Sequence, residues 1–335
     1  MFKFLQDKLV CPLCHGELKW AVLEESPTRI IKADISCISC GEEYSVRDQV
    51  VNFLINSKAE PDLWQTGEDN LERFFKLNPE IRARLMVAPF EEMSAADMYV
   101  KAMLLEKEGN EKEAEKLMNI ATINAYTKEM LDATDKEFKY LINLLRKQSQ
   151  FVVDIASGPG VLVKQILQNT DLKVVITDLS MSIIKRTYNS LIKEGYGERI
   201  TFIAFDARTT PFRNNSVPII TSFVGLQNID NPDNIISELK RISSGEFYSV
   251  CSFCSEDDDI NRADLRKSGI ESMYLKKKHV DEFVNNGWKV ELLNPILAKS
   301  SPTPMSKILP NVGVDGFPVA DGIFEHCIVK ASVLL

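Results

Sequence analysis

Four cysteines near the start of the chain have the spacing of a metal site. Cys11 and Cys14 are separated by two residues, as are Cys37 and Cys40, and 22 residues lie between the two pairs. Each pair places two thiolates on one tight turn, and two such turns supply the tetrahedral four-sulfur set that Zn²⁺ prefers. A module this short buries little apolar surface. We therefore expect Zn²⁺ to supply much of its folding free energy.

Three acidic residues and a glycine turn could bind a nucleotide-like ligand in the second half of the chain. An apolar run ends at Asp154 and opens into a turn that contains Gly158 and Gly160, after which apolar residues resume at helical spacing. Glycine can take positive φ and lets a ligand approach the main chain, and the N-terminus of the following helix presents free N–H groups. The next two apolar runs end at Asp178 and Asp206. The pattern predicts strands and loops that hold a nucleotide, with the acid of the second strand beside its ribose.

Two other interpretations of this turn stay open. A dinucleotide site would have a third glycine three positions after Gly160, where Val163 stands, so NAD fits this sequence less well. In the other interpretation, the acids only end their strands and the fold has lost its ligand. The protein would then be a non-enzymatic binding or assembly module.

From Phe151 to Leu335 the chain resembles the class I S-adenosylmethionine-dependent methyltransferases, in particular the small-molecule type of ubiquinone biosynthesis. The resemblance implies that Asp178 binds the ribose hydroxyls of the cofactor and Asp206 its adenine amino group. It also implies that Asp154 helps to hold the glycine loop and the amino end of the cofactor. The full cofactor-binding set implied is Asp154, Ala156, Ser157, Gly158, Gly160, Asp178, Leu179, Asp206 and Ala207. The commonest family pattern has glycine where this chain has Ala156.

Residues 8–18 and 40–54 resemble the small zinc-ribbon proteins that are activating partners of tRNA, rRNA and release-factor methyltransferases. The ending from Tyr44 to Asp48 is the most specific part of this resemblance. It implies a zinc ribbon joined in one chain to a methyltransferase. Such a ribbon could contact an RNA or protein substrate, or it could only stabilise the fold, and both possibilities stay open.

Strand and helix patterns alternate in the second half of the chain, which predicts an α/β fold with helices on both faces of a sheet. We expect a doubly wound, mostly parallel, seven-stranded Rossmann-like sheet that closes with an antiparallel pair of strands. The predicted divisions are a zinc ribbon at 1–56, a helical segment that covers the active site at 57–148, and the methyltransferase domain at 149–335. Ser94–Asp97 and Thr134–Glu137 are expected to begin helices, because both match a capping arrangement.

Three polar residues are candidates for contact with a methyl acceptor. Tyr126 lies near the end of a helix in the helical segment, and Gln227 and Asn228 follow the fourth predicted strand of the sheet. The methyltransferase resemblance places the loop after that strand beside the transferred methyl group. Each candidate also has a structural explanation, since the tyrosine could pack in a helical core and the amides could cap the next helix.

Composition limits the choice of partners. The 335 residues carry a formal net charge of −8, which argues against broad phosphate binding and favours a small-molecule acceptor over RNA or a translation protein. No run approaches the ~20 apolar residues that span a membrane, and residues 1–8 lack the pattern of a secretory signal. We therefore expect a cytoplasmic protein that does not bind membranes.

The remaining three cysteines have two interpretations. Cys251 and Cys254 lie at the end of the fifth predicted strand, and Cys327 lies in the last one. Together they could bind a soft metal or metalloid as an acceptor. Buried cysteines more often act as small apolar residues.

Overall fold

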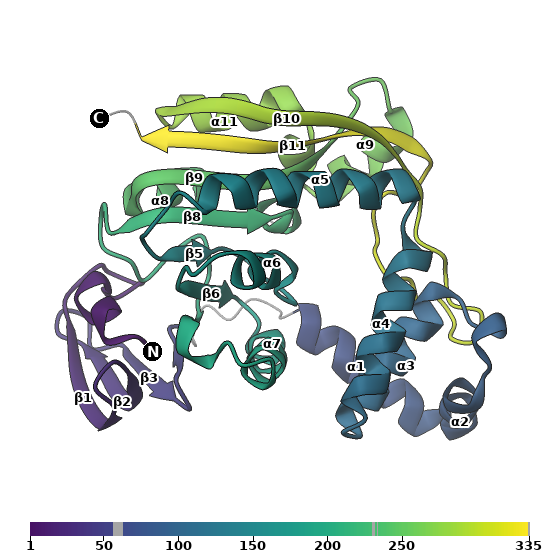
Figure 1. The fold of residues 1–335 in the computed structure, drawn as a ribbon, viewed down its shortest axis with the longest axis horizontal. Helices are drawn as coiled ribbons and strands as arrows, with labels where there is room; N and C mark the ends of the chain where they lie inside the picture. Colours follow the sequence, from purple (N-terminus) through teal and green to yellow (C-terminus); the bar gives the residue numbers. More distant parts are fainter. Residues whose placement is uncertain (56–62, 230–231, 233, 334–335) are drawn as a thin grey trace.

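The computed structural model describes residues 1–55, 63–229, 232 and 234–333, and a single eleven-stranded sheet runs through them (Figure 1). Its strand order is β1-β2-β3-β4-β7-β6-β5-β8-β9-β11-β10. The prediction of seven strands is therefore wrong for the sheet as a whole, because the four strands of the N-terminal region extend it. The boundary expected at residues 56 and 57 lies outside the described residues.

The strands are short in the N-terminal region and long at the carboxyl end of the chain. They are β1 (Leu18–Glu25), β2 (Ile30–Cys37), β3 (Glu43–Arg47), β4 (Val50–Asn52), β5 (Val152–Asp154), β6 (Val174–Asp178), β7 (Ile200–Ala204), β8 (Val217–Phe223), β9 (Ser243–Cys254), β10 (Trp288–Ser300) and β11 (Gly322–Val333).

The helices occur before, between and after the parallel strands. The α-helices are α1 (Leu63–Leu77), α2 (Pro79–Val87), α3 (Ala95–Lys107), α4 (Glu111–Ala125), α5 (Lys128–Leu145), α6 (Val161–Asn169), α7 (Met181–Lys193), α8 (Ile235–Ile242), α9 (Asp259–Lys267), α10 (Glu271–Tyr274) and α11 (Lys276–Asn285). The 3₁₀ helices are η1 (Lys3–Lys8), η3 (Phe90–Glu92), η4 (Gly197–Arg199) and η5 (Gly225–Asn228).

The seven strands β5 to β11 form the predicted doubly wound part of the sheet. β5 to β9 are parallel, and β11 pairs antiparallel with both β9 and β10, which confirms the expected closing pair. Their apolar side chains fill two clusters, one with α5, α6 and α7 and the other with α8 and α11. Strands buried on both faces require near-continuous apolar runs, which the central strands β5, β6 and β7 have. In such sheets ligands bind outside the carboxyl ends of the strands, where the order reverses beside β5.

The N-terminal strands join this sheet through β4, which pairs in parallel with β7 over Val50–Asn52 and Phe202–Ala204. Arg29, of which only 6% is exposed, donates from its guanidinium to the carbonyl oxygens of Ile200 and Gly197. The N-terminal residues pack into the apolar cluster that also contains β5 and β8. The ribbon and the sheet therefore share one core.

Helices α1 to α4 lie beyond the carboxyl ends of the central strands (Figure 1). The predicted capping box at Ser94–Asp97 is confirmed at the start of α3. The Asp97 carboxylate also accepts hydrogen bonds from the hydroxyl of Ser306 and from the main-chain N–H groups of Lys307 and Ile308. This buried acid thus ties residues 301–321, the connection between β10 and β11, to the helical segment.

Helix α5 packs across β9, β10 and β11 (Figure 1). The prediction that a helix begins at Thr134 is wrong, because α5 begins after Thr127, whose hydroxyl accepts a hydrogen bond from the N–H of Met130. The hydroxyl of Thr134 instead donates to the carbonyl of Met130 within the helix. Among the described residues, no helix is both long enough and apolar enough to cross a membrane.

Candidate functional site

Asp154 ends β5 in the centre of the sheet, where only 2% of it is exposed. One carboxylate oxygen accepts a hydrogen bond of 2.6 Å from the hydroxyl of Thr221 in the neighbouring strand β8. Burial raises the pKa of this carboxyl to about 6, although its hydroxyl partners Thr221 and Ser157 oppose the rise. A buried acid at a strand end is a functional-site candidate when it lies beside a turn that can hold a ligand.

The turn after β5 has a left-handed main chain at three positions. Gly158 and Gly160 have φ of 51° and 74°, and Ala156 has φ of 51°. A side chain in this region costs roughly 1–2 kcal/mol, which explains why glycine suits position 156 better. A Cβ on Gly225, after β8, would lie 2.8 Å from the carbonyl oxygen of Ala156. The turn is therefore held against the loop after β8.

Asp178 ends β6 and holds the turn from the other side. Its carboxylate accepts hydrogen bonds of 2.9 Å from the N–H groups of Gly158 and Ser180. The hydroxyl of Ser157 donates to the carbonyl of Asp154, and its N–H donates to the carbonyl of Thr177. The first two acids thus lie on either side of one turn, while Leu179 follows directly and is half-buried.

Asp206 follows β7, the next strand along the same edge, and Ala207 beside it packs against the core. The guanidinium of Arg208 donates to both carboxylate oxygens of Asp206, with distances of 2.8–3.1 Å. An adenine amino group at this position would have to share the carboxylate with Arg208 or displace it. The structure brings all three predicted acids to the carboxyl ends of adjacent parallel strands.

Gln227 is fully buried and uses its amide to join β9 to α10. Its nitrogen donates to the carbonyl oxygens of Ser252 and Met273, and its oxygen accepts from the N–H of Ser252. Because all of these hydrogen bonds are to main-chain groups, Gln227 has a structural role. Asn228 accepts a hydrogen bond of 3.2 Å from the hydroxyl of Tyr274.

Tyr126 lies at the end of α4, where its hydroxyl donates to the carboxylate of Asp315 over 2.5 Å. Asp315 contacts solvent, yet partial desolvation by the surrounding chain raises its pKa. Burial followed by the charge of this acid raises the pKa of Tyr126 and Tyr274. Asp315 and Tyr274 were missed in the sequence, because neither lies in a motif and the fold alone brings them together.

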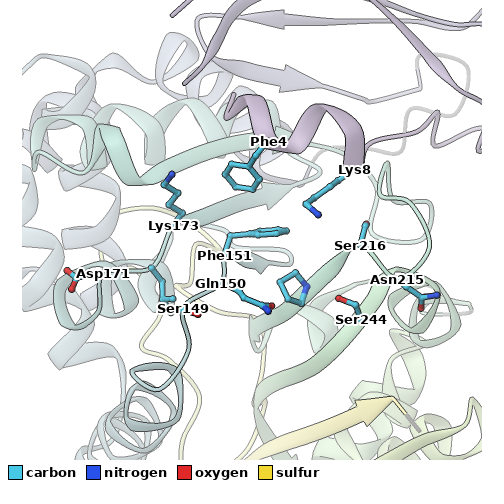
Figure 2. A pocket seen from close by; sticks show the side chains of 12 residues that line it. Phe4, Lys8, Ser149, Gln150, Phe151, Asp171, Lys173, Asn215, Ser216 and Ser244 are labelled. Carbon is cyan, nitrogen blue, oxygen red and sulfur yellow. The ribbon is translucent and has the colours of Figure 1, made fainter. Parts of the chain in front are cut away.

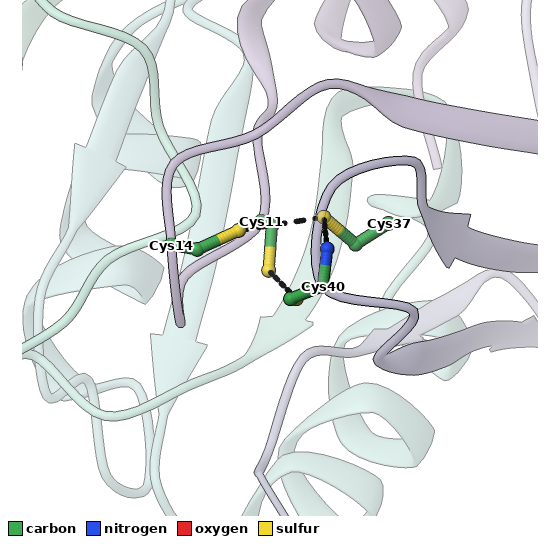
Figure 3. Close-up of side chains that lie close together, drawn as sticks. All are labelled: Cys11, Cys14, Cys37 and Cys40. Carbon is green, nitrogen blue, oxygen red and sulfur yellow. Dashed lines mark hydrogen bonds between the residues drawn. The ribbon is translucent and has the colours of Figure 1, made fainter.

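The four cysteines of the two close pairs meet at one point (Figure 3). The Sγ atoms of Cys11 and Cys40 are 3.7 Å apart, and those of Cys14 and Cys37 are 3.5 Å apart. A tetrahedron with Zn–S bonds of ~2.3 Å has edges of about 3.8 Å, so this set fits Zn²⁺. A Cβ on Gly16 would lie 2.5 Å from the Ser39 hydroxyl, so glycine lets the two turns approach each other.

Cys251 and Cys327 pair across β9 and β11 and are both buried. Burial raises the pKa of Cys251 to about 12, which keeps it a neutral thiol. Among the described residues, only the four N-terminal cysteines form a group of three or more suitable side chains close enough to bind one metal ion. The described geometry does not support a metalloid site with Cys254.

Residues 152–244 match the methyltransferase domain family. Over 93 residues the chain is 34% identical to the ubiquinone/menaquinone biosynthesis C-methyltransferase UbiE of Hahella chejuensis, an alignment that covers 27% of this chain and 37% of that protein. It is 28% identical over 107 residues to the UbiE protein of Legionella pneumophila strain Philadelphia 1, covering 31% and 43% of the two chains. The chain thus spans less than half the length of these curated relatives.

Solved structures also align with this chain. The YcgJ protein of Bacillus subtilis has a TM-score of 0.47 at 14% identity and covers 60% of this chain and 99% of its own. The segment that matches the methyltransferase domain family contains the glycine turn and all three strand-terminal acids. This segment is therefore similar to methyltransferase domains, which supports the prediction of an S-adenosylmethionine-dependent methyltransferase.

The burial of Asp154 predicts a pH-dependent effect on the stability of the protein. Asp154→Asn should raise the free energy of unfolding near neutral pH by about 1–3 kcal/mol, because the amide keeps the Thr221 contact without a buried charge. The gain should shrink as the pH falls below about 6 and vanish near pH ~4, since the native carboxyl then binds its proton. Urea unfolding across this range measures it, with Asp281→Asn on the surface of α11 as control. Equal stability of the variant and the native protein at pH ~7.5 would contradict the pKa assignment.

Proposed function

We propose that this protein transfers a methyl group from S-adenosylmethionine to a small-molecule acceptor by in-line displacement. The observation that carries the proposal is the arrangement of Asp154, Asp178 and Asp206 at adjacent strand ends around one glycine turn, within the segment that matches the methyltransferase domain family. The ubiquinone/menaquinone names of the matched relatives support an acceptor of low molecular mass.

Each acid would have its own part in cofactor binding. Asp178 would accept from the ribose hydroxyls while it keeps the N–H of Gly158 in place. Asp154 would orient the amino end through the turn that it supports. Asp206 would bind the adenine amino group once Arg208 makes room. The bound sulfonium supplies an electrophilic methyl group, so the protein mainly has to align the acceptor, and alignment can contribute roughly 7–11 kcal/mol.

The acceptor would bind beside Asp315, Tyr126 and Tyr274. The raised pKa values keep both phenols protonated at neutral pH, and their hydroxyl groups already donate to Asp315 and Asn228, so they would hold these side chains in place rather than remove a proton. Asp315 would orient a hydroxyl or amine of the acceptor. A carboxylate at this position and the net charge of −8 disfavour a polyanion such as RNA. With the predicted division at 1–56, 57–148 and 149–335, the cofactor would bind to the third part and the acceptor between the second and third parts.

The two N-terminal cysteine turns would hold a structural Zn²⁺ ion. Four sulfurs leave no open coordination position, which is typical of structural rather than catalytic zinc. The sulfur distances and the Gly16 contact support this assignment. The ion would cross-link the turns and stabilise the ribbon.

Cofactor binding tests the first part of the proposal. Asp178→Ala should weaken binding of S-adenosylhomocysteine by about 1–3 kcal/mol, because the ribose hydroxyls and the Gly158 N–H both lose a charged acceptor. Isothermal titration calorimetry measures the change, and Asp281→Ala is the matched surface control. No binding to the native protein would favour a non-enzymatic module, and unchanged affinity of Asp178→Ala would remove the acid from the site.

Transfer of a radiolabelled methyl group tests the acceptor class. We expect label to enter hydroxylated aromatic acceptors such as quinols and not total RNA. Asp315→Asn should slow transfer about tenfold or more at unchanged affinity for S-adenosylhomocysteine, because it disturbs alignment only. Asp321→Asn, an exposed acid of the same connection paired with Lys299, is the control. Label in RNA, or native rates in Asp315→Asn, would contradict the assignment.

A further inference from the structure

A cavity lies at the opposite edge of the sheet from the strand-terminal acids. It has a volume of about 590 Å³ and opens where β5, β6, β8 and β9 begin, beneath the helix η1 of the ribbon (Figure 2). This volume is within the range of small-molecule sites, roughly 300–1,000 Å³. The methyl-transfer proposal uses none of its residues.

Aromatic rings form one wall of this N-terminal-edge cavity. Phe4 and Phe151 contact each other with ring centroids 5.2 Å apart, and Phe2 stacks on Phe4 at 5.3 Å. Phe4 is 38% exposed, although most large apolar side chains of the ribbon are buried. An exposed phenyl ring beside a cavity offers a surface on which a planar ring can stack.

Two ammonium groups flank these rings (Figure 2). The Nζ atom of Lys8 lies 5.8 Å from the centre of the Phe151 ring, and that of Lys173 lies 5.6 Å from the centre of the Phe4 ring. Neither lysine forms an ion pair with a described residue, whereas nearby Arg213 is paired with Glu17. Asp171 also lines the cavity, but two cations without an ion pair to a described residue, on opposite sides of one aromatic wall, form a local site for an anion.

We propose that this cavity binds a nucleoside phosphate. Its base would stack on the phenyl wall, its phosphate would pair with Lys8 and Lys173, and the side-chain amides of Gln150 and Asn215 would face the polar edge of the base. The nucleotide comes either as a free molecule or as one unit of a single-stranded RNA. The site is independent of methyl transfer, because it lies at the other end of the strands.

Calorimetric titration with AMP, adenosine, inorganic phosphate and a 5′-phosphorylated oligoribonucleotide tests this site. Saturating S-adenosylhomocysteine is present throughout, so that the adenine of AMP or adenosine cannot bind at the proposed methyl-transfer site and contribute to the measured heat. AMP should bind about tenfold more tightly than adenosine or phosphate, because it uses both the rings and the cations. Its affinity should fall with added salt. Tighter binding of the oligonucleotide than of AMP would identify RNA as the source, and the reverse would identify a free nucleotide.

Variants assign the binding to this cavity. Lys8→Ala combined with Lys173→Ala should weaken AMP binding about tenfold or more, and Phe4→Leu should weaken it while keeping an apolar side chain. The matched control combines Lys116→Ala and Lys267→Ala, two exposed lysines distant from the cavity. Thermal unfolding confirms that each variant is folded. Three results would overturn the proposal. The first is no binding of AMP or the oligonucleotide up to ~5 mM, and the second is binding of phosphate alone as tight as that of AMP. The third is native affinity in the folded double variant.

Discussion

The parallel pairing of β4 with β7 is the contact on which the rest of the structure depends. It covers three residues of each strand, yet it makes the ribbon the edge of the methyltransferase sheet. Main-chain hydrogen bonds continue the contact beyond the strands, from the N–H of Val10 to the carbonyl of Pro211 and from the N–H of Arg213 to the carbonyl of Lys8. Val10 precedes Cys11, and Pro211 ends the loop that begins at Asp206. One short segment therefore connects the N-terminal cysteine turns to the loop that begins at Asp206.

This continuity gives the proposed cofactor site two different kinds of support. The acids of β5 and β6 are held in the centre of the sheet, where the neighbouring strand β8, the glycine turn and the start of α7 supply hydrogen bonds to their carboxylates. The acid after β7 would lie at an open edge if the ribbon were absent. Glu238 stabilises the far side of its loop, because it accepts hydrogen bonds from the N–H and hydroxyl of Thr210 and pairs with Arg241. The N-terminal strands therefore support Asp206, the proposed adenine contact, more than they support Asp154 and Asp178.

The sequence was sufficient to predict the features that depend only on local spacing and on the order of the strands. Parallel strands bring their carboxyl ends to one edge, so the order of Asp154, Asp178 and Asp206 was sufficient to place them together. Two close cysteine pairs likewise predicted their meeting point, since each pair is a single turn. The fusion of the ribbon into the sheet could not be predicted in this way, because β4 has only three residues and pairs across about 150 residues of chain.

Other features depended on tertiary contacts that no local pattern contains. The sequence around Thr134 matches a helix start, but α5 begins after Thr127. A tertiary contact holds Thr127 in place, because its hydroxyl donates to the carbonyl of Lys299 in β10. Gln227 could have faced an acceptor, but its side chain is buried, and a buried amide must form hydrogen bonds with the main-chain groups that pack against it. Asp315 lies in a connection rich in turn residues, and only the folding of that connection onto α4 brings it to Tyr126.

Removal of the metal ion tests the central claim most directly. Purified protein should contain one Zn²⁺ per chain, and a chelator-treated sample of the same preparation should bind S-adenosylhomocysteine at least about fivefold more weakly, a coupling of ~1 kcal/mol. Circular dichroism must show that the central sheet is still folded, and added Zn²⁺ must restore the affinity. Equal affinity in metal-loaded and metal-free protein, or a purified chain without zinc, would show that the ribbon does not support the adenine side of the site.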